Sequence, residues 1–187
     1  ANGAANAWGG SCEWIDNPLN DASNSSSKVL KVTSTETAAT ELPFSLPEGK
    51  TLLDYIGVRL QLAIIDACGE NIHWVGCDLG VQNNNNLSNR CWPATSSWQT
   101  GELNTWMTLD FFFDESTLSA WLATEQSDDM SLLVKVGRQK FIYVIDNIEL
   151  LEKTQYVGDD TQTYFGVNLS GAEFGGVYPG EDGTHYG

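Results

Sequence analysis

The sequence predicts an all-β fold, a β-sandwich of the jelly-roll type with about eight antiparallel strands and a C-terminal extension. Short runs rich in β-branched and aromatic residues are separated by turn residues along most of the chain. Two of the longest runs alternate between apolar and polar residues, as half-buried strands do. Eight such runs equal the number of strands in a jelly roll.

The expected strands follow one another along the chain, with a long polar loop between the fifth and the sixth. They are Ala7–Ile15, Lys28–Thr35, Ala38–Phe44, Tyr55–Ile65, Ile72–Gln82, Trp106–Phe113, Ser131–Val136 and Phe141–Leu151. One short helix is expected at Glu115–Ala123, with Ser116 as its cap and Leu118 and Leu122 on one face.

Two of these strands predict which side chains face the core. In Tyr55–Ile65 the residues that share the apolar face are Val58, Leu60, Leu62 and Ile64, and Arg59 and Gln61 share the other. In Ile72–Gln82 the expected core face holds Val75, Cys77, Leu79 and Val81. Its opposite face carries Trp74, Asp78 and Gln82, with Gly76 and Gly80 between them.

Charge excludes some classes of partner. The 187 residues are 41% hydrophobic, which suffices for a core, and 9 Lys and Arg oppose 25 Asp and Glu, for a net charge of −16. Such a chain repels phosphate backbones and anionic lipid, so neither nucleic acid nor a membrane is an expected partner. No apolar run is long enough to span a bilayer.

Four cysteines, Cys12, Cys68, Cys77 and Cys91, lack the close spacing of a zinc site. They predict two disulfides in one of three connectivities, an oxidising compartment and a secreted, extracellular protein. If residues 68 to 77 form a hairpin that turns at Gly69, a bond between Cys68 and Cys77 is disfavoured. The sequence does not open on a basic and then apolar signal peptide, so we expect a mature or trimmed start whose leader has been removed.

Catalysis by residues 1–153 is not expected. The sequence has no G-x-S-x-G motif and no phosphate-binding glycine loop, and His73 is the one histidine in this part of the chain. Binding of a sugar is easier to support, because seven Trp are available. A sugar ring has an apolar C–H face and a rim of hydroxyl groups, which suit an aromatic plane with polar neighbours.

The predicted carbohydrate-binding site is centred on the polar face of Ile72–Gln82. There Gly76 and Gly80 would leave a low floor beside the larger side chains. Arg59 and Gln61 would extend the polar rim if their strand is a neighbour in the same sheet. The full set is Trp74, Asp78, Gln82, Trp92, Trp98, Arg59 and Gln61, with Trp92 and Trp98 as a wall on the long loop.

Asp146 closes an otherwise apolar strand, and a buried carboxylate needs a partner. One explanation is a structural calcium ion held by Asp146, by Glu13 or Asp16 from the N-terminal strand, and by backbone carbonyls. The other explanation is that backbone N–H groups cap the carboxylate. The sequence leaves both open.

Four segments resemble the β-jelly-roll carbohydrate-binding modules of plant-cell-wall hydrolases. They are Lys28–Val32, Asp54–Leu60, Thr105–Leu109 and Tyr143–Leu150, and the resemblance spans about Ala7 to Glu152. It implies a calcium-ligating role for Asp146 and an aromatic-lined cleft on the concave sheet. The family's ligand positions vary, so it does not select the tryptophans named above.

The tail carries a second resemblance. Phe165–Gly175 is similar to the first barrel strand of family 5 glycoside hydrolases, chiefly endo-β-1,4-glucanases, whose two catalytic glutamates lie much further along. The predicted organisation is therefore a module at 1–153, a linker at 154–163 and the truncated start of a (β/α)8 domain at 164–187. No catalytic residue is carried over to this chain, because residues 164–187 match only the first part of the barrel and not the positions of the two glutamates.

Together these observations predict a non-catalytic module that binds β-glucan chains such as cellulose, mixed-linkage glucan or xyloglucan. It would target an attached endo-β-1,4-glucanase to plant cell wall polysaccharide. The alternative is a structural β-sandwich that braces the catalytic domain without binding sugar. A β-sandwich enzyme, such as a lyase or hydrolase acting through acidic residues, is a third hypothesis. Exposure of the tryptophans along one groove separates the first two.

Overall fold

A computed structural model of the chain describes residues 6–7, 9–19, 21–35, 39–73, 75–94, 97–99, 102–124, 129–137 and 140–153. For residues 6–7 and 97–99 the description covers the backbone alone. Ala1–Leu151 forms one compact unit of the chain, and Glu152–Gly187 belongs to a second. The architecture described below is that of the first unit.

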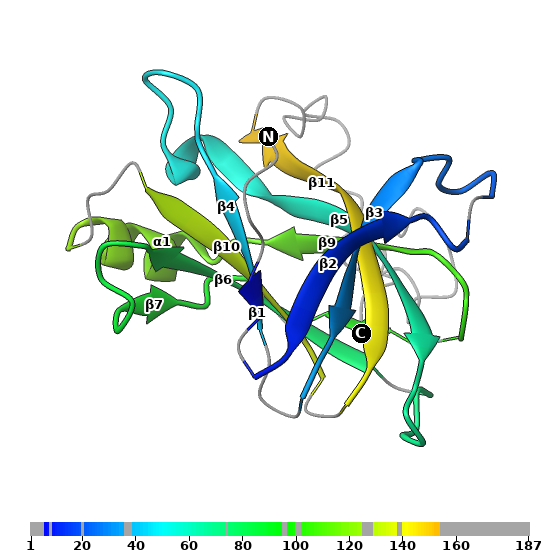
Figure 1. The fold of residues 1–187 in the computed structure, drawn as a ribbon. Coiled ribbons are helices and arrows are strands. Elements are labelled where there is room, and N and C mark those ends of the chain that lie inside the picture. The colour runs from blue at the N-terminus through cyan, green and yellow to red at the C-terminus, as the bar shows by residue number, and fades with distance from the viewer. Residues whose placement is uncertain are drawn as a thin grey trace, which may run out of the picture. The chain divides into compact units, whose positions relative to one another are not determined.

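Two antiparallel sheets make up this unit (Figure 1). Sheet A contains, in spatial order, β1 (Asn6–Ala7), β4 (Thr40–Phe44), β10 (Met130–Val136), β6 (Val75–Asn83) and β7 (Arg90–Cys91), and β8 (Ser97–Gln99) also pairs with β6. Sheet B contains, in spatial order, β2 (Ser11–Asp16), β3 (Lys28–Thr33), β11 (Ile142–Glu152), β5 (Tyr55–Asp66) and β9 (Met107–Phe112). The predicted β-sandwich is confirmed.

All eight expected strands are present, with boundaries shifted by a few residues. The first expected strand divides at Gly9, whose φ of 62° lies in the left-handed region, so β2 begins at Ser11. The expected polar loop contains two short strands, β7 and β8, which both pair with β6. They were not predicted because strands of two or three residues are too short to show an alternation of apolar and polar residues.

The connection from β5 to β6 is not a hairpin. The two strands belong to different sheets, so the segment around Gly69 crosses from sheet B to sheet A. Gly69 has a φ of 86° and Cys68 a φ of 51°, both in the left-handed region, which reverses the chain direction after β5. The expected turn is therefore real, but it joins sheets instead of neighbouring strands.

A single α-helix, α1 (Glu115–Leu122), and the short 3-10 helix η1 (Leu52–Asp54) pack next to each other among the described residues. The cap of α1 is Asp114, because its carboxylate accepts a hydrogen bond from the Thr117 N–H at 2.7 Å, which corrects the expectation of Ser116. Its buried face holds Leu118 and Trp121. None of the described helices has the length and apolar character needed to cross a membrane.

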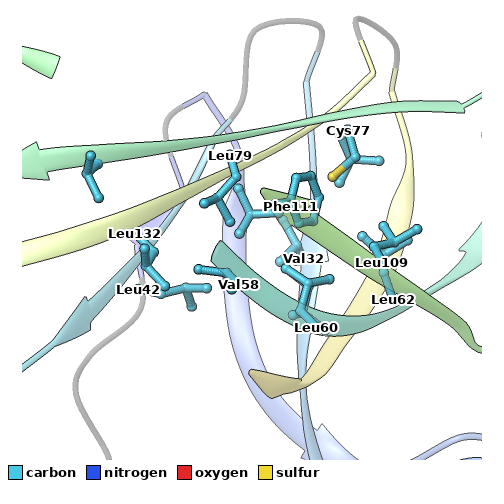
Figure 2. Close-up of a cluster of buried hydrophobic side chains, with 14 of the residues drawn as sticks. Val32, Leu42, Val58, Leu60, Leu62, Cys77, Leu79, Leu109, Phe111 and Leu132 are labelled. Atoms are coloured by element: carbon cyan, nitrogen blue, oxygen red, sulfur yellow. The ribbon is translucent and has the colours of Figure 1, made fainter. Parts of the chain in front are cut away.

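The core lies between the two sheets, as Figure 2 shows. The predicted inward faces of β5 and β6 are confirmed, because the four apolar residues expected from each strand belong to this core. Side chains from sheet A meet those from sheet B there, among them Leu79 and Leu132 opposite Val58, Leu60 and Phe111. Removal of this apolar surface from water is the main contribution to folding.

A hydrogen bond between two buried hydroxyl groups crosses the core. The hydroxyl groups of Tyr143 in β11 and Thr40 in β4 lie 3.0 Å apart, and both residues are fully buried. This hydrogen bond links sheet B to sheet A in a region where neither hydroxyl can reach water. Burial raises the pKa of the Tyr143 phenol well above its ordinary value, so the group stays protonated and can act as donor.

The Tyr143 and Thr40 pair generates a stability prediction. We expect Tyr143→Phe to lower the free energy of unfolding by about 1–3 kcal/mol, because it leaves the Thr40 hydroxyl buried without its partner. Adding Thr40→Val should recover part of the loss, since the second change removes the stranded group. Urea denaturation of the wild type, both single variants and the double variant measures the coupling. Strictly additive losses would contradict a direct bond.

Candidate functional site

Trp92 packs on the outer face of sheet A, directly over a glycine. The pairing of Val81 with Cys91 places Trp92 beside Gly80 of β6. A Cβ atom added at Gly80 would lie 2.8 Å from Cε3 and 3.0 Å from Cδ2 of the Trp92 indole. The ring therefore rests on the backbone of β6 with no side chain beneath it, and the residue remains 40% exposed.

This contact revises two expectations. Gly80 was expected to leave an open floor and Trp92 to form a wall, but Trp92 itself covers the floor at Gly80. The outer surface of sheet A thus presents an indole supported from below by backbone. Such a ring is suited to stack with the apolar face of a ligand that approaches from solvent.

Asp78 and Gln82 flank Gly80 on the outward side of β6, as predicted. Asp78 is partly exposed and lies opposite Lys135 of β10 in the strand register. Gln82 is fully buried, so the expected direct contact of Gln82 with a ligand is not supported by its position. Its carbonyl oxygen Oε1 instead accepts a hydrogen bond from Nε of Arg90 at 2.7 Å.

Arg90 was absent from the predicted site. It is exposed, it pairs with Gln82 in the register, and Trp92 follows it by two residues. The sequence Arg90-Cys91-Trp92 alternates between polar, buried and aromatic residues. In a strand, a buried Cys91 turns both of its neighbours outward, so this alternation could have predicted that Arg90 and Trp92 share one face. The β6–β7 pair thus brings an aromatic ring and a guanidinium group together on one face.

The other two tryptophans of the predicted site are only partly located. Trp74 and the side chain of Trp98 lie outside the described residues. The backbone of Trp98 in β8 is the register partner of Gly76 in β6. Because β8 pairs with β6 alone among the described strands, the Trp98 position lies at an edge of sheet A.

Arg59 does not extend this rim. Arg59 was predicted to belong to the binding site only if its strand, β5, were a neighbour of β6 in the same sheet. Instead β5 belongs to sheet B and β6 to sheet A. Arg59 forms a two-pronged ion pair with Asp110 of β9, with Nε to Oδ1 at 2.7 Å and Nη2 to Oδ2 at 2.8 Å. The hydrogen bonds from Arg59 hold the pKa of Asp110 below its ordinary value. This pair braces the β5–β9 ladder.

Gln61 is also on sheet B, where it anchors the loop that joins β2 to β3. Its Oε1 accepts hydrogen bonds from Nδ2 of Asn24 at 3.0 Å and from Nδ2 of Asn147 at 2.6 Å, and its Nε2 donates to the Ser23 carbonyl. Asn24 is 2% exposed. Gln61 therefore has a structural role in fixing this loop against the outer face of sheet B.

The two expected calcium ligands are not brought together as one ligand set. Oδ2 of Asp146 accepts a hydrogen bond from Nδ2 of Asn24 at 2.9 Å, and the Glu13 carboxylate is paired with Lys31 at 2.8 Å. Within the described ranges no group of three or more His, Cys, Asp or Glu side chains could hold a metal ion. Calcium at Asp146, with Glu13 as its second carboxylate, stays a prediction.

No disulfide joins the four cysteines, so the two expected bonds are absent from the structure. Cys77 and Cys91 are buried on the strands β6 and β7 of sheet A, whereas Cys68 is exposed in the turn after β5. Burial raises the pKa of the thiols of Cys12, Cys77 and Cys91, which favours the protonated form. Cys91 acts as an inward anchor for the segment that carries Trp92.

The fold resembles solved carbohydrate-binding modules, although no family model and no curated protein matches the sequence. The CBM22-1 xylan-binding domain of Xyn10C from Paenibacillus barcinonensis matches with a TM-score of 0.50 and 14% identity, over 79% of this chain and 86% of that domain. At this identity the likeness shows the fold alone, which is a β-sandwich.

Two further structures match less closely. A carbohydrate-binding module of the β-sandwich superfamily has a TM-score of 0.46 and 14% identity over 80% of this chain, which spans 56% of the length of that one. The family 11 module of the cellulosomal cellulase Lic26A-Cel5E from Clostridium thermocellum has a TM-score of 0.43 and 13% identity, over 81% of this chain and 84% of that one.

The packing of Trp92 predicts the effect of a methyl group at Gly80. We expect Gly80→Ala to displace the indole and to lower the free energy of unfolding by about 1–3 kcal/mol, as overpacking does. The same change made in a Trp92→Ala background should cost less, because only the Cys91 carbonyl oxygen, 2.9 Å from the added Cβ, then remains in its way. Thermal melts of the four proteins measure this coupling. Equal losses in both backgrounds would show that the collision is with the Cys91 carbonyl and that the ring gives way without cost.

A second prediction concerns Asn24 and Asp146. We expect Asn24→Ala to lower the free energy of unfolding by about 1–3 kcal/mol, because Gln61 and Asp146 both lose a buried donor. The exposed Ser45→Ala serves as the control, with a change within about 0.5 kcal/mol.

The calcium prediction at Asp146 has a separate test, in which the melting temperature of the wild type is compared with and without EDTA. A melting temperature lower by several degrees in EDTA would show that the protein binds a cation, as the sequence predicts. An unchanged melting temperature would contradict the calcium site and would identify Asn24 as the partner of Asp146.

Proposed function

We propose that this chain is a non-catalytic module that binds β-glucan, such as cellulose, mixed-linkage glucan or xyloglucan, on the outer face of sheet A. The Trp92 indole supplies the stacking surface for the apolar face of a sugar ring. Polar groups on either side, including Asp78, provide partners for the hydroxyl rim. Binding needs no chemistry beyond stacking and hydrogen bonds.

The observation that carries this proposal is the support of an exposed indole by a glycine. An exposed tryptophan that merely completed a core would have apolar side chains beneath it. Trp92 has the Gly80 backbone there, at a position where any side chain would collide with the ring. The likeness in fold to a xylan-binding domain supports a glycan ligand in general terms.

The choice of β-glucan among glycans depends on the tail. Phe165–Gly175 is similar to the start of family 5 glycoside hydrolases, and these residues lie outside those that the structure describes. In the proposed whole protein an endo-β-1,4-glucanase would follow the module, and both would be secreted. Tethering raises the local concentration of the enzyme on an insoluble polymer without a new contact.

Affinity electrophoresis against a panel of soluble β-glucans and xylans tests the proposal. We expect at least one β-glucan to retard the wild type, and Trp92→Ala to weaken binding about tenfold or more, because the loss of a stacked aromatic costs on the order of 2 kcal/mol. Trp14→Ala is the matched control. Trp14 is 54% exposed but lies on the edge strand β2 of sheet B, so its loss should leave binding unchanged.

Two results would contradict the proposal. If no polysaccharide retards the wild type, the chain is better explained as a sandwich that braces its neighbouring domain. If Trp14→Ala weakens binding and Trp92→Ala does not, the ligand binds elsewhere on the module. Trp74→Ala and Trp98→Ala in the same gels test the two remaining predicted tryptophans, which the described side chains do not include.

A further inference from the structure

We propose that Arg90, held in place by the buried Gln82, donates hydrogen bonds to the hydroxyl rim of a neutral sugar ring stacked on Trp92. This inference rests on the proposed function and names the polar half of the same site. In it Arg90 touches the ligand, whereas Gln82 is a positioning residue that acts through Arg90.

The strand register places the two ligand-binding side chains next to each other. Arg90 and Trp92 are two residues apart, so they project from the same side of the chain, about 7 Å apart along it. Opposite them on β6, Gln82 and Gly80 have the same spacing. Gln82 thus supports Arg90 from the neighbouring strand, just as Gly80 supports Trp92.

A series of hydrogen bonds orients the side chain of Gln82, which in turn holds Arg90. Arg90 donates to Gln82, whose Nε2 donates to Oδ1 of Asn84 at 3.5 Å; that oxygen also accepts from the Ser131 hydroxyl at 3.0 Å. Nδ2 of Asn84 then donates to Oδ1 of Asp129 at 2.7 Å. Arginine has no acceptor and a carboxylate has no donor, so the two ends dictate the orientation of both amides.

The burial of these hydrogen-bonded side chains indicates a positioning role. Gln82 is 0% exposed and Ser131 is 1% exposed, although both lie on the outward side of their strands. A buried polar network is seldom more stable than apolar packing of the same volume, and its attested benefit is a specified geometry. Here the specified geometry is that of the guanidinium plane of Arg90. Orienting a long side chain in advance reduces the entropy lost on binding.

The chemistry of Arg90 defines the class of ligand. Its guanidinium only donates, so the ligand must present oxygen acceptors beside the stacked ring. Neutral hydroxyl oxygens and carboxylates both qualify. The acidic Asp78 and Asp129 border the same strands, and the chain has a net charge of −16, which disfavours an anionic glycan. The ligand is therefore a neutral glycan with hydroxyl groups at the ring edge.

Isothermal titration of the full chain with cellohexaose tests the assignment. We expect Arg90→Met to weaken binding about tenfold or more, because hydrogen bonds from a charged donor are lost. Gln82→Met should weaken it several-fold, and Gln82→Glu, which keeps the acceptor for Arg90, should retain more affinity. In the Arg90→Met background Gln82→Met should have no further effect, since a positioning residue acts only through the group it positions.

Four results would overturn the inference. Arg90→Met could bind cellohexaose as the wild type does, the effects of the two substitutions could add, or an oligosaccharide of glucuronic acid could bind more tightly than cellohexaose. A wild type that does not bind cellohexaose also overturns it. The proposed function has its own test in the affinity gels. If a β-glucan retards the wild type and does not retard Trp92→Ala, the proposed function holds even where the role of Arg90 fails, so the two failures are distinguishable. Thermal melts of each variant confirm that it is folded.

Discussion

The apolar contact between the inner faces of sheets A and B is the constraint on which the rest of this module depends. Side chains on a strand alternate between the two faces, so burying Leu79 and Val81 turns Gly80 and Gln82 outward. A slip by one residue would expose the core set and bury Asp78. The register of the core therefore also determines the floor of the proposed binding site.

The two outer faces of the sandwich differ in what their polar side chains contact. On sheet B, polar side chains such as Gln61 hold the β2–β3 loop, and the Arg59 and Asp110 pair joins two strands. Sheet A instead supports an exposed indole and a guanidinium group with residues that are themselves buried or lack a side chain. An arginine thus has a structural role on sheet B, where Arg59 pairs with Asp110, and a proposed role in ligand binding on sheet A, where Arg90 lies beside Trp92.

Much of the fold was predictable because its signals are local. The alternation in β5 and β6 identified both core faces, and the runs of β-branched residues located eight strands. The errors arose where pairing is not local. Nothing in the composition of residues 55–66 and 75–83 shows that they belong to different sheets, so Arg59 and Gln61 were assigned to a site that their sheet does not share. The spacing of the cysteines likewise suggested bonds that the structure does not form.

The amino-acid sequence by itself determined that the chain is a β-sandwich, which side chains of its long strands enter the core, and that the chain is acidic. Only the tertiary structure decided that Trp92 rests on Gly80 and that the buried Gln82 holds Arg90. Periodicity along one strand reports which face a residue takes. The neighbour across the sheet depends on strand order and register, which long-range packing alone settles.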